Sequence, residues 1–190
     1  AKGDKQNLLM AILDVQAAYD TVPMSAVEAG LKRIKAPVSF INLLKNMEAN
    51  RTQTFSTAYG PTKHLQSTRG LPQGGILSPT LWNIFYDPLL CALQRQTIGY
   101  SIPSGIKNVP GRVKITSVSF ADDLHPFAQT NKDMQHQLQI IHDFLSYHKM
   151  AMGALKSKIL CNNQKLVDAT DSNIITERTF KLGEDQISNI

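Results

Sequence analysis

The stretch KITSVSFADDLHPFA, residues 114–128, places two neighbouring acids, Asp122 and Asp123, between two runs in which apolar and polar residues alternate. Such alternation is typical of strands that are buried on one face. The sequence therefore predicts a hairpin with strands at residues 113–120 and 124–129 and a turn at residues 121–123, so that both acids lie at its tip. Taken alone, two aspartates at a hairpin tip more often serve the turn than a metal ion.

A third acid favours a metal role over a turn role for the paired acids. The run NLLMAILDV, residues 7–15, is continuously apolar up to Asp14, as expected of a buried strand that ends on an acid. An acid in such a place is costly unless it is paired or bound to metal. A strand ending at Asp14 can lie beside the hairpin and bring Asp14, Asp122 and Asp123 together. Two carboxylates about 4 Å apart in a partly screened site repel by roughly 4 kcal/mol, so the cluster needs cations.

The surroundings of these acids favour a hard divalent cation. Oxygen ligands with little histidine or cysteine nearby suit Mg²⁺, which usually takes one or two carboxylates together with substrate phosphates. Two such ions activate the attacking oxygen and stabilise the leaving oxygen in phosphoryl transfer, as in polymerases and nucleases. The carboxylates by themselves leave the choice between these two classes open.

The rest of the chain alternates predicted helices and short strands. Helices are expected after Pro23, after Pro37, over residues 79–94 with a kink at Pro88, and from Asn131 onward. Apolar residues recur at helical spacing in three of these helices. They are Ala26, Val27, Gly30, Leu31 and Ile34 after Pro23; Phe40, Ile41, Leu44 and Met47 after Pro37; and Met134, Leu138, Ile141 and Leu145 after Asn131. A surface strand over residues 51–60 is expected to stop at a Gly-Pro turn, and residues 157–162 and 174–182 are weaker strand candidates. The pattern predicts a single α+β unit, with an antiparallel sheet backed by helices.

Composition excludes several classes of protein. The chain has 190 residues, of which 42% are hydrophobic and 18% charged, which indicates a globular domain rather than a disordered one. A net charge of +5 favours a polyanionic partner without establishing one. Cys91 and Cys161 are isolated, so we expect a reducing, intracellular compartment, the cytoplasm or the nucleus, and no disulfide framework. No apolar run approaches the roughly 20 residues of a membrane span, and no membrane partner is expected.

Three segments together resemble the central palm motifs of reverse transcriptases, in the right order and at plausible spacing. They are AILDVQAAYDTV, RGLPQGGILSP and FADD. Downstream, GALKSKIL resembles the fourth palm motif through Lys158, and TFKLG resembles a shortened primer grip. The similarity is nearest to non-LTR retrotransposons, because an acid, Asp20, follows Tyr19 and because Arg-Gly precedes the glutamine loop. RNA-dependent RNA polymerases normally carry a glycine before their paired acids, where this chain has Ala121.

The resemblance implies an RNA-directed DNA polymerase palm with part of the fingers, which uses two Mg²⁺ ions, or Mn²⁺ as a substitute. Its implied partners are an RNA template, a DNA or RNA primer and a deoxynucleoside triphosphate (dNTP). The resemblance implies that the metal ions are bound by Asp14, Asp122, Asp123 and the Val15 carbonyl. It implies that Tyr19 selects the sugar and that Gln73 and Gly74 contact the incoming nucleotide. It further implies that Lys158 neutralises the pyrophosphate and that Leu182 and Gly183 support the primer end.

Alternatives remain open at this point. Tyr19 can instead be a core tyrosine, and Lys158 a solvated lysine. The whole chain can be a catalytically silent, degenerate or domesticated element that serves as a nucleic-acid-binding or structural module. The presence of all three acids favours chemistry. Residues 1–190 are expected to be a palm with partial fingers, a fragment without N-terminal fingers and C-terminal thumb, and poorly active when isolated.

Overall fold

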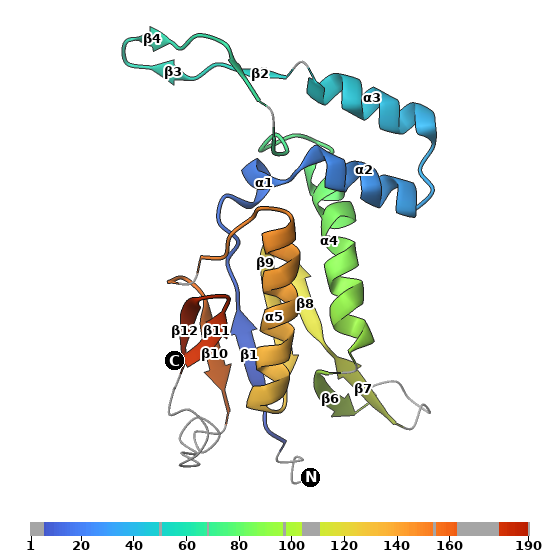
Figure 1. Ribbon diagram of the computed structural model, residues 1–190, viewed down its shortest axis with the longest axis vertical. Helices are drawn as coiled ribbons and strands as arrows, with labels where there is room; N and C mark the ends of the chain where they lie inside the picture. The colour runs from blue at the N-terminus through green and yellow to red at the C-terminus, as the bar shows by residue number, and fades with distance from the viewer. Residues whose placement is uncertain are drawn as a thin grey trace. The chain divides into compact units, whose positions relative to one another are not determined.

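The structure, a computed structural model, describes residues 6–49, 51–67, 69–96, 98–103, 111–153, 155–162 and 179–189. Internal contacts divide the chain into two compact units. The sheet unit comprises Ala1–Gln16 and Pro88–Ile190, and the helical unit comprises Ala17–Asp87. Both are drawn in Figure 1.

The sheet unit is built on a six-stranded sheet with the order β11-β12-β10-β1-β9-β8. Its strands are β1 (Leu9–Ile12), β8 (Ser117–Phe120), β9 (Asp123–Ala128), β10 (Lys158–Cys161), β11 (Thr179–Leu182) and β12 (Asp185–Asn189). Neighbours pair antiparallel except β10 and β12, which are parallel. The predicted antiparallel sheet is therefore confirmed with this one exception. The apolar run that ends at Asp14 forms β1, between β9 and β10.

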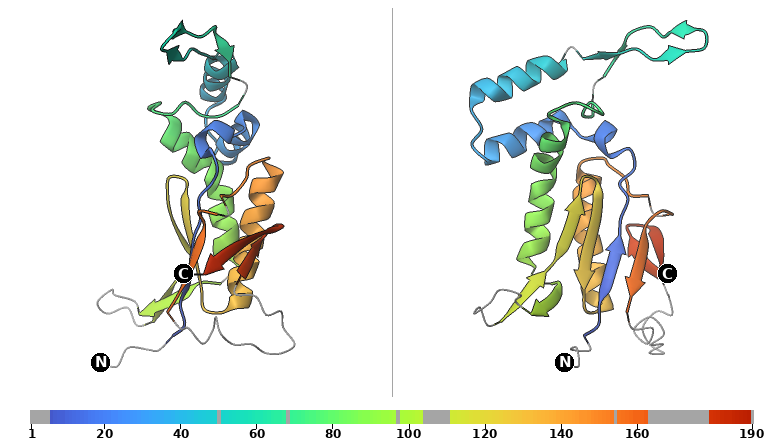
Figure 2. Two further views of the ribbon diagram at one scale, coloured as in Figure 1. Left: turned by 90° about the vertical axis from the view of Figure 1, so that its left-hand side faces the viewer. Right: turned by 180° about the vertical axis from the view of Figure 1, so that it is seen from behind.

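One face of this sheet is covered by helix α5 (Asn131–Tyr147), as Figure 2 shows. Along β1 and just beyond it, Leu9, Ala11 and Leu13 are fully buried, as the period-two pattern requires. The predicted apolar stripe of α5 is confirmed, with Met134, Leu138, Ile141 and Leu145 buried. Thr130 begins the helix, because its side chain accepts a hydrogen bond from the Asp133 N–H at 3.1 Å. Residues on the opposite face of the sheet are left less buried.

The hairpin that carries the paired acids is formed by β8 and β9. Its last pair is Phe120 with Asp123, so that only Ala121 and Asp122 form the turn. The prediction of a turn over residues 121–123 was therefore wrong at Asp123, which belongs to the strand. The predicted strand at residues 113–120 is also divided, because β7 (Arg112–Ile115) pairs with β6 (Tyr100–Pro103) instead.

Strand β9 continues through Pro126, which is buried and pairs with Ser117 of β8. Pairing with β1 is present at Leu9–Ala128 and Met10–Phe127 and resumes at Leu13–Leu124. Pro126 lies in the gap between them, where its missing N–H removes a ladder hydrogen bond. The same register on both sides of the gap keeps the ends of β1 and β9 aligned.

The helical unit contains α1 (Ala18–Thr21), α2 (Met24–Arg33), α3 (Val38–Ala49) and the first part of α4 (Ser78–Arg95), the helix that runs through Pro88. Helix α2 packs closely on α4 at Gly30, where an added Cβ would lie 2.8 Å from the Ile84 side chain. The predicted helices after Pro23 and Pro37 are confirmed. Their apolar stripes were overestimated at the C-terminal ends, because Ile34 and Met47 are more than half exposed.

Residues 52–66, called the arm below, leave α3 as a two-stranded ribbon. Strand β2 (Thr52–Gln53) pairs with β5 (Leu65–Gln66), and β3 (Ser56–Thr57) pairs with β4 (Gly60–Pro61). The turn therefore lies at residues 58–59, and the predicted turn at Gly60–Pro61 was wrong. In the described part of the chain, no helix is both long and apolar enough to cross a bilayer.

Candidate active site

Asp14, just beyond the end of β1, lies directly opposite Asp123, the first residue of β9. The residues beside them, Leu13 and Leu124, exchange both backbone hydrogen bonds, with N–H to carbonyl distances between heavy atoms of 3.0 and 3.3 Å. In an antiparallel pair the next residues outward face each other across a non-hydrogen-bonded position, with their side chains on one face. Leu13 and Leu124 point into the core, so Asp14 and Asp123 lie on the face opposite α5. Both carboxylates thus share the less buried side of the sheet.

Asp122 occupies the two-residue turn next to Asp123. The turn begins at Ala121, which has a φ of 52°, in the left-handed region that side chains other than glycine rarely adopt. This conformation closes the hairpin tightly, and Asp122 is partly buried there. Strain held at such a position is often part of a functional site.

The three predicted metal ligands do not form a complete site by themselves. Within the ranges that the structure describes, no three acidic, histidine or cysteine side chains lie close enough together to hold a metal ion. The donor set is nevertheless chemically suited to a hard divalent cation, because it consists of carboxylates and the Val15 carbonyl. Val15 is buried and forms a bridge with Met152. The residues therefore fit Mg²⁺ or Mn²⁺ in chemistry, and metal binding stays a prediction.

A turn that precedes β10 holds Asp14 from its other side. The Gly153 N–H donates to the Asp14 carbonyl at 2.8 Å, and the Asp14 N–H donates to Ser157 Oγ at 3.4 Å. Ser157 is fully buried and its hydroxyl also donates to the Gly153 carbonyl at 3.0 Å. Lys156 reaches the carboxylate itself, with its Nζ 3.6 Å from Asp14 Oδ2. The sequence interpretation singled out none of these three residues.

Lys158, the lysine that the resemblance to the fourth palm motif indicates, lies in β10 directly opposite Ile12. Residues that face each other across a pair share one face, and Asp14 is two residues beyond Ile12 on that face. Lys158 is therefore on the same side of the sheet as Asp14. Lys156, in contrast, forms an ion pair with Asp14. Because Lys156 lies in a turn and not in a strand, the periodicity of the sequence does not reveal this role.

In the helical unit, the structure brings Tyr19 next to the start of the glutamine loop. The Tyr19 ring stacks on Trp82 of α4, with centroids 5.3 Å apart and planes 24° apart. The Tyr19 carbonyl accepts a hydrogen bond from the Leu71 N–H at 2.6 Å. Both contacts fix the ring and its backbone. Tyr19 itself is only partly buried.

Gln73 and Gly74 are exposed at the tip of the glutamine loop. The Gln73 side-chain amide donates to the Asp20 carboxylate at 3.1 Å, which links the loop to the residue after Tyr19. Gly74 has a φ of 81° and open space around its Cα, whereas a Cβ on Gly75 would lie 2.6 Å from Ser78 Oγ. The two glycines therefore differ: Gly74 leaves its backbone accessible to a ligand, and Gly75 permits close packing.

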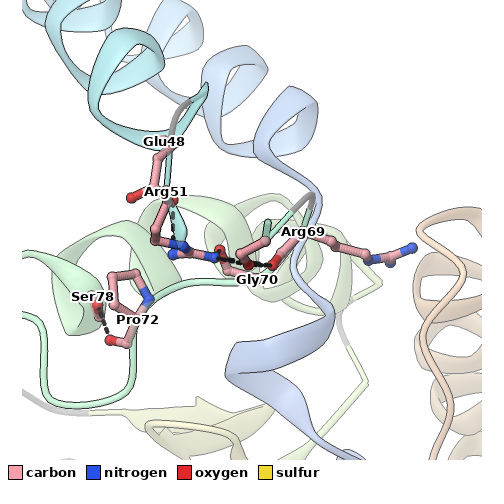
Figure 3. Close-up of polar contacts among 7 residues, drawn as sticks. Glu48, Arg51, Arg69, Gly70, Pro72 and Ser78 are labelled. Carbon is pink, nitrogen blue, oxygen red and sulfur yellow. Dashed lines mark hydrogen bonds and ion pairs between the residues drawn. The ribbon is translucent and has the colours of Figure 1, made fainter. Parts of the chain in front are cut away.

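Arg51 anchors the start of this loop, as Figure 3 shows. Its Nη2 donates to Ser67 Oγ at 2.7 Å and to the carbonyls of Arg69 and Gly70 at 3.0 and 2.8 Å. Its Nη1 forms an ion pair with Glu48 at 2.7 Å, and both side chains are mostly buried. The loop closes on its other side where Ser78 Oγ donates to the Pro72 carbonyl at 2.5 Å. A single arginine in a polar stretch carries no sequence signal for this role.

Leu182 and Gly183 lie at the hairpin between β11 and β12. Leu182 is buried and pairs with Asp185. Gly183 has a φ of 67°, and a Cβ there would lie 2.2 Å from Cε1 of His142 on α5. The predicted primer-grip segment is thus a tight turn held against α5, whereas residues 163–178 lie outside the described part of the chain.

These observations define a polymerase palm with part of the fingers: an acid-bearing hairpin, a second acid on the adjacent strand, and a glutamine loop joined to the segment after that acid. A family model described as reverse transcriptase (RNA-dependent DNA polymerase) matches residues 1–182. The chain belongs to the reverse transcriptase family.

Relatives agree with the non-LTR type of this family. The chain is 33% identical over 146 residues to the Pol polyprotein of the type-1 retrotransposable element R2 of Popillia japonica, covering 76% of this chain and 20% of that protein. It is 28% identical over 188 residues to the R2 Pol polyprotein of Nasonia vitripennis, covering 97% of this chain and 17% of that protein. The chain thus spans about a fifth of the length of these curated relatives.

A solved structure supports the fold independently. Telomerase from Candida tropicalis, determined in complex with a fragment of telomeric RNA, superposes with a TM-score of 0.62 at 13% sequence identity. The match covers 85% of this chain and 27% of that one. At this level of identity the likeness concerns the fold alone, and it confirms the predicted palm architecture.

Proposed function

We propose that this chain is the catalytic core of an RNA-directed DNA polymerase that adds deoxynucleotides to a primer 3′-hydroxyl on an RNA template. The observation that carries the proposal is the Leu13–Leu124 pairing, which sets Asp14 and Asp123 at the same level of neighbouring strands. The family match supports the same reaction. A silent nucleic-acid-binding module is less favoured, because that function requires none of these carboxylates.

The proposed cofactors are two divalent cations, Mg²⁺ or Mn²⁺, held by Asp14, Asp122, Asp123 and the Val15 carbonyl. When bound, such ions activate an attacking hydroxyl and stabilise the charge on a leaving phosphate oxygen. Gly153 and Ser157 contribute by restraining the Asp14 backbone, since a ligand that is already in position needs no reorganisation during the reaction.

The proposed nucleotide site lies on the helical unit. Stacking on Trp82 and the backbone bond to Leu71 hold the Tyr19 ring in one orientation, so the ring can act as a fixed steric barrier to a ribose 2′-hydroxyl. Gln73 offers both a donor and an acceptor to a nucleotide, and the Asp20 carboxylate orients its amide. Gly74 allows the backbone to approach that nucleotide closely.

Two lysines are candidates for neutralising or protonating the departing pyrophosphate. Lys158 lies on the same face of the sheet as Asp14, and Lys156 is paired with Asp14 directly. We propose that Leu182 and Gly183 support the primer end, because their hairpin packs against α5 at His142.

Primer extension tests the proposal. The chain, within its full-length parent protein, is given an annealed RNA template, a DNA primer, dNTPs and Mg²⁺. Two substitutions of proposed metal ligands, Asp122→Ala and Asp14→Asn, are compared with Asp143→Asn, which changes an exposed acid of α5. Loss of a metal ligand should reduce the rate by about 100-fold or more, since the metal supplies several kcal/mol of charge stabilisation. Asp143→Asn should retain normal activity. Extension that survives Asp122→Ala unchanged would refute the proposal.

A further inference from the structure

The arm at residues 52–66 takes no part in the catalytic assignments above and projects away from α2 and α3 (Figure 1). It lies within a long stretch, residues 49–86, that contains no aspartate or glutamate. Within the arm itself the basic residues are Lys63 and His64. A surface element with basic residues and no acids suits a polyanionic ligand.

The two halves of the arm are out of register by one residue. Pairing runs from Thr52–Gln66 and Gln53–Leu65 to Thr54 and His64, whose side chains are hydrogen-bonded at 3.0 Å. The next pair is Phe55 with Thr62, joined by the Thr62 N–H to the Phe55 carbonyl at 2.9 Å and by the Phe55 N–H to Thr62 Oγ1.

Lys63 is therefore the extra residue of a β-bulge. A bulge bends its strand and re-aims the side chain that has no opposite neighbour. Lys63 is exposed, and His64 beside it is exposed too. The bulge thus presents two adjacent basic residues away from the regular ladder of the ribbon.

Large apolar side chains are exposed at three places along the arm. Tyr59, in the turn between β3 and β4, is fully exposed, and Phe55 and Leu65 are each just over half exposed. Alternation along the strands places Phe55 and Leu65 on one face, because Leu65 is opposite Gln53 and Phe55 is two residues farther along. These side chains add nothing to the core of the helical unit, and their exposure points to a ligand.

We propose that the arm binds single-stranded RNA, with bases stacked on Tyr59 and Phe55 and phosphates contacted by Lys63 and His64. Aromatic side chains interleaved with basic residues form the typical platform for unpaired bases, which stack on any exposed ring. A duplex keeps its bases stacked on one another and offers no free base face to the tip of a narrow ribbon. A docked protein is less favoured, because threonines and the basic bulge interrupt the apolar residues. The choice of RNA over DNA rests on the proposed function, in which the template is RNA.

Fluorescence anisotropy with a labelled single-stranded RNA of mixed sequence tests this binding on the full chain. Tyr59→Ala and Phe55→Ala are compared with Tyr147→Ala, an aromatic residue that is 84% exposed on α5 outside the arm. Each arm substitution should raise Kd about 5-fold or more, the value expected for losing one stacked base, and Tyr147→Ala should leave Kd unchanged. Lys63→Gln should reduce the slope of log Kd against log salt by about 0.7. Unaltered melting temperatures confirm that each variant is folded.

Equal Kd values for the wild type, Tyr59→Ala and Phe55→Ala would overturn the proposal. So would arm variants that change sedimentation of the protein alone without changing RNA affinity, because the arm would then be a protein interface. A single-stranded DNA of the same sequence that binds more tightly than the RNA would overturn the choice of ligand. Asp122→Ala separates this proposal from the polymerase proposal, since it should abolish extension while RNA affinity is retained.

Discussion

The Asp14 carboxylate occupies the space that a side chain at residue 153 would need: a Cβ added to Gly153 would lie 2.7 Å from Asp14 Oδ2 and 3.4 Å from the Asp14 carbonyl oxygen. The glycine belongs to a turn that also binds the Asp14 backbone through Gly153 N–H and Ser157 Oγ. Three features of one turn thus determine where a proposed metal ligand lies. A Cβ at residue 153 would conflict with the Asp14 carboxylate in this position, and the backbone of Gly153 is not left-handed.

Substitution of Gly153 should therefore act on the metal site. Gly153→Ala should displace the Asp14 carboxylate and raise the Mg²⁺ concentration needed for half-maximal primer extension by about 10-fold or more, as for other residues that orient metal ligands. Gly30→Ala is the matched control, because a Cβ at Gly30 would also be too close to a neighbour, with Ile84 at 2.8 Å, and Gly30 belongs to the helical unit whereas the three acids belong to the sheet unit. It should lower the melting temperature without changing the Mg²⁺ dependence. Equal Mg²⁺ dependence in the wild type and Gly153→Ala would contradict this role.

The two lysines of the 153–160 segment should differ in their effect on the rate. Lys156 is 77% exposed in its ion pair with Asp14, so its removal should change the free energy of unfolding by less than about 1 kcal/mol. We expect Lys156→Ala to lower single-turnover nucleotide addition by about 100-fold and Lys158→Ala to lower it much less, because Lys156 Nζ lies 3.6 Å from the Asp14 carboxylate. Rapid-quench kinetics on both variants measure these single-turnover rates. A larger loss in Lys158→Ala would return the role to the strand residue.

Tyr19 should control sugar discrimination. Tyr19→Ala removes the ring that stacks on Trp82, which should increase incorporation of ribonucleotides relative to deoxynucleotides by about 10-fold or more. Tyr19→Phe retains the ring and should keep the discrimination of the wild type. The measurement is the ratio of kcat/KM for paired ribonucleotide and deoxynucleotide substrates. An unchanged ratio in Tyr19→Ala would leave Tyr19 a purely structural residue.

Arg51 should be essential to the stability of the helical unit. Arg51→Ala leaves Glu48 without its partner and removes three hydrogen bonds to the segment that precedes the glutamine loop, so it should cost about 3 kcal/mol or more. The control is Arg33→Ala, whose ion pair with Asp87 is almost half exposed and should contribute less than about 1 kcal/mol. Urea unfolding measures both. Similar losses in the two variants would show that burial does not strengthen the Arg51 cluster.

Local pattern in the sequence was sufficient for the main elements of the sheet unit. The apolar run before Asp14 became β1, and the apolar spacing after Asn131 became α5, because each period reports directly which face is buried. The paired acids were placed at a hairpin tip for the same reason. The three motifs also sufficed to indicate the reverse transcriptase family, since together they specify residues of one reaction.

Tertiary structure alone decided how those residues are held. The register of β8 and β9 moved Asp123 from the turn into a strand, and a shift of one residue reverses the face on which a side chain lies. The pairing of Lys156 with Asp14 joins residues far apart in the chain, and Arg51 anchors backbone carbonyls 18 and 19 residues away. Such contacts depend on packing between distant segments and leave no periodic trace in the sequence. The acids can therefore be identified from the sequence, whereas the contacts that hold them in position are known only from the tertiary structure.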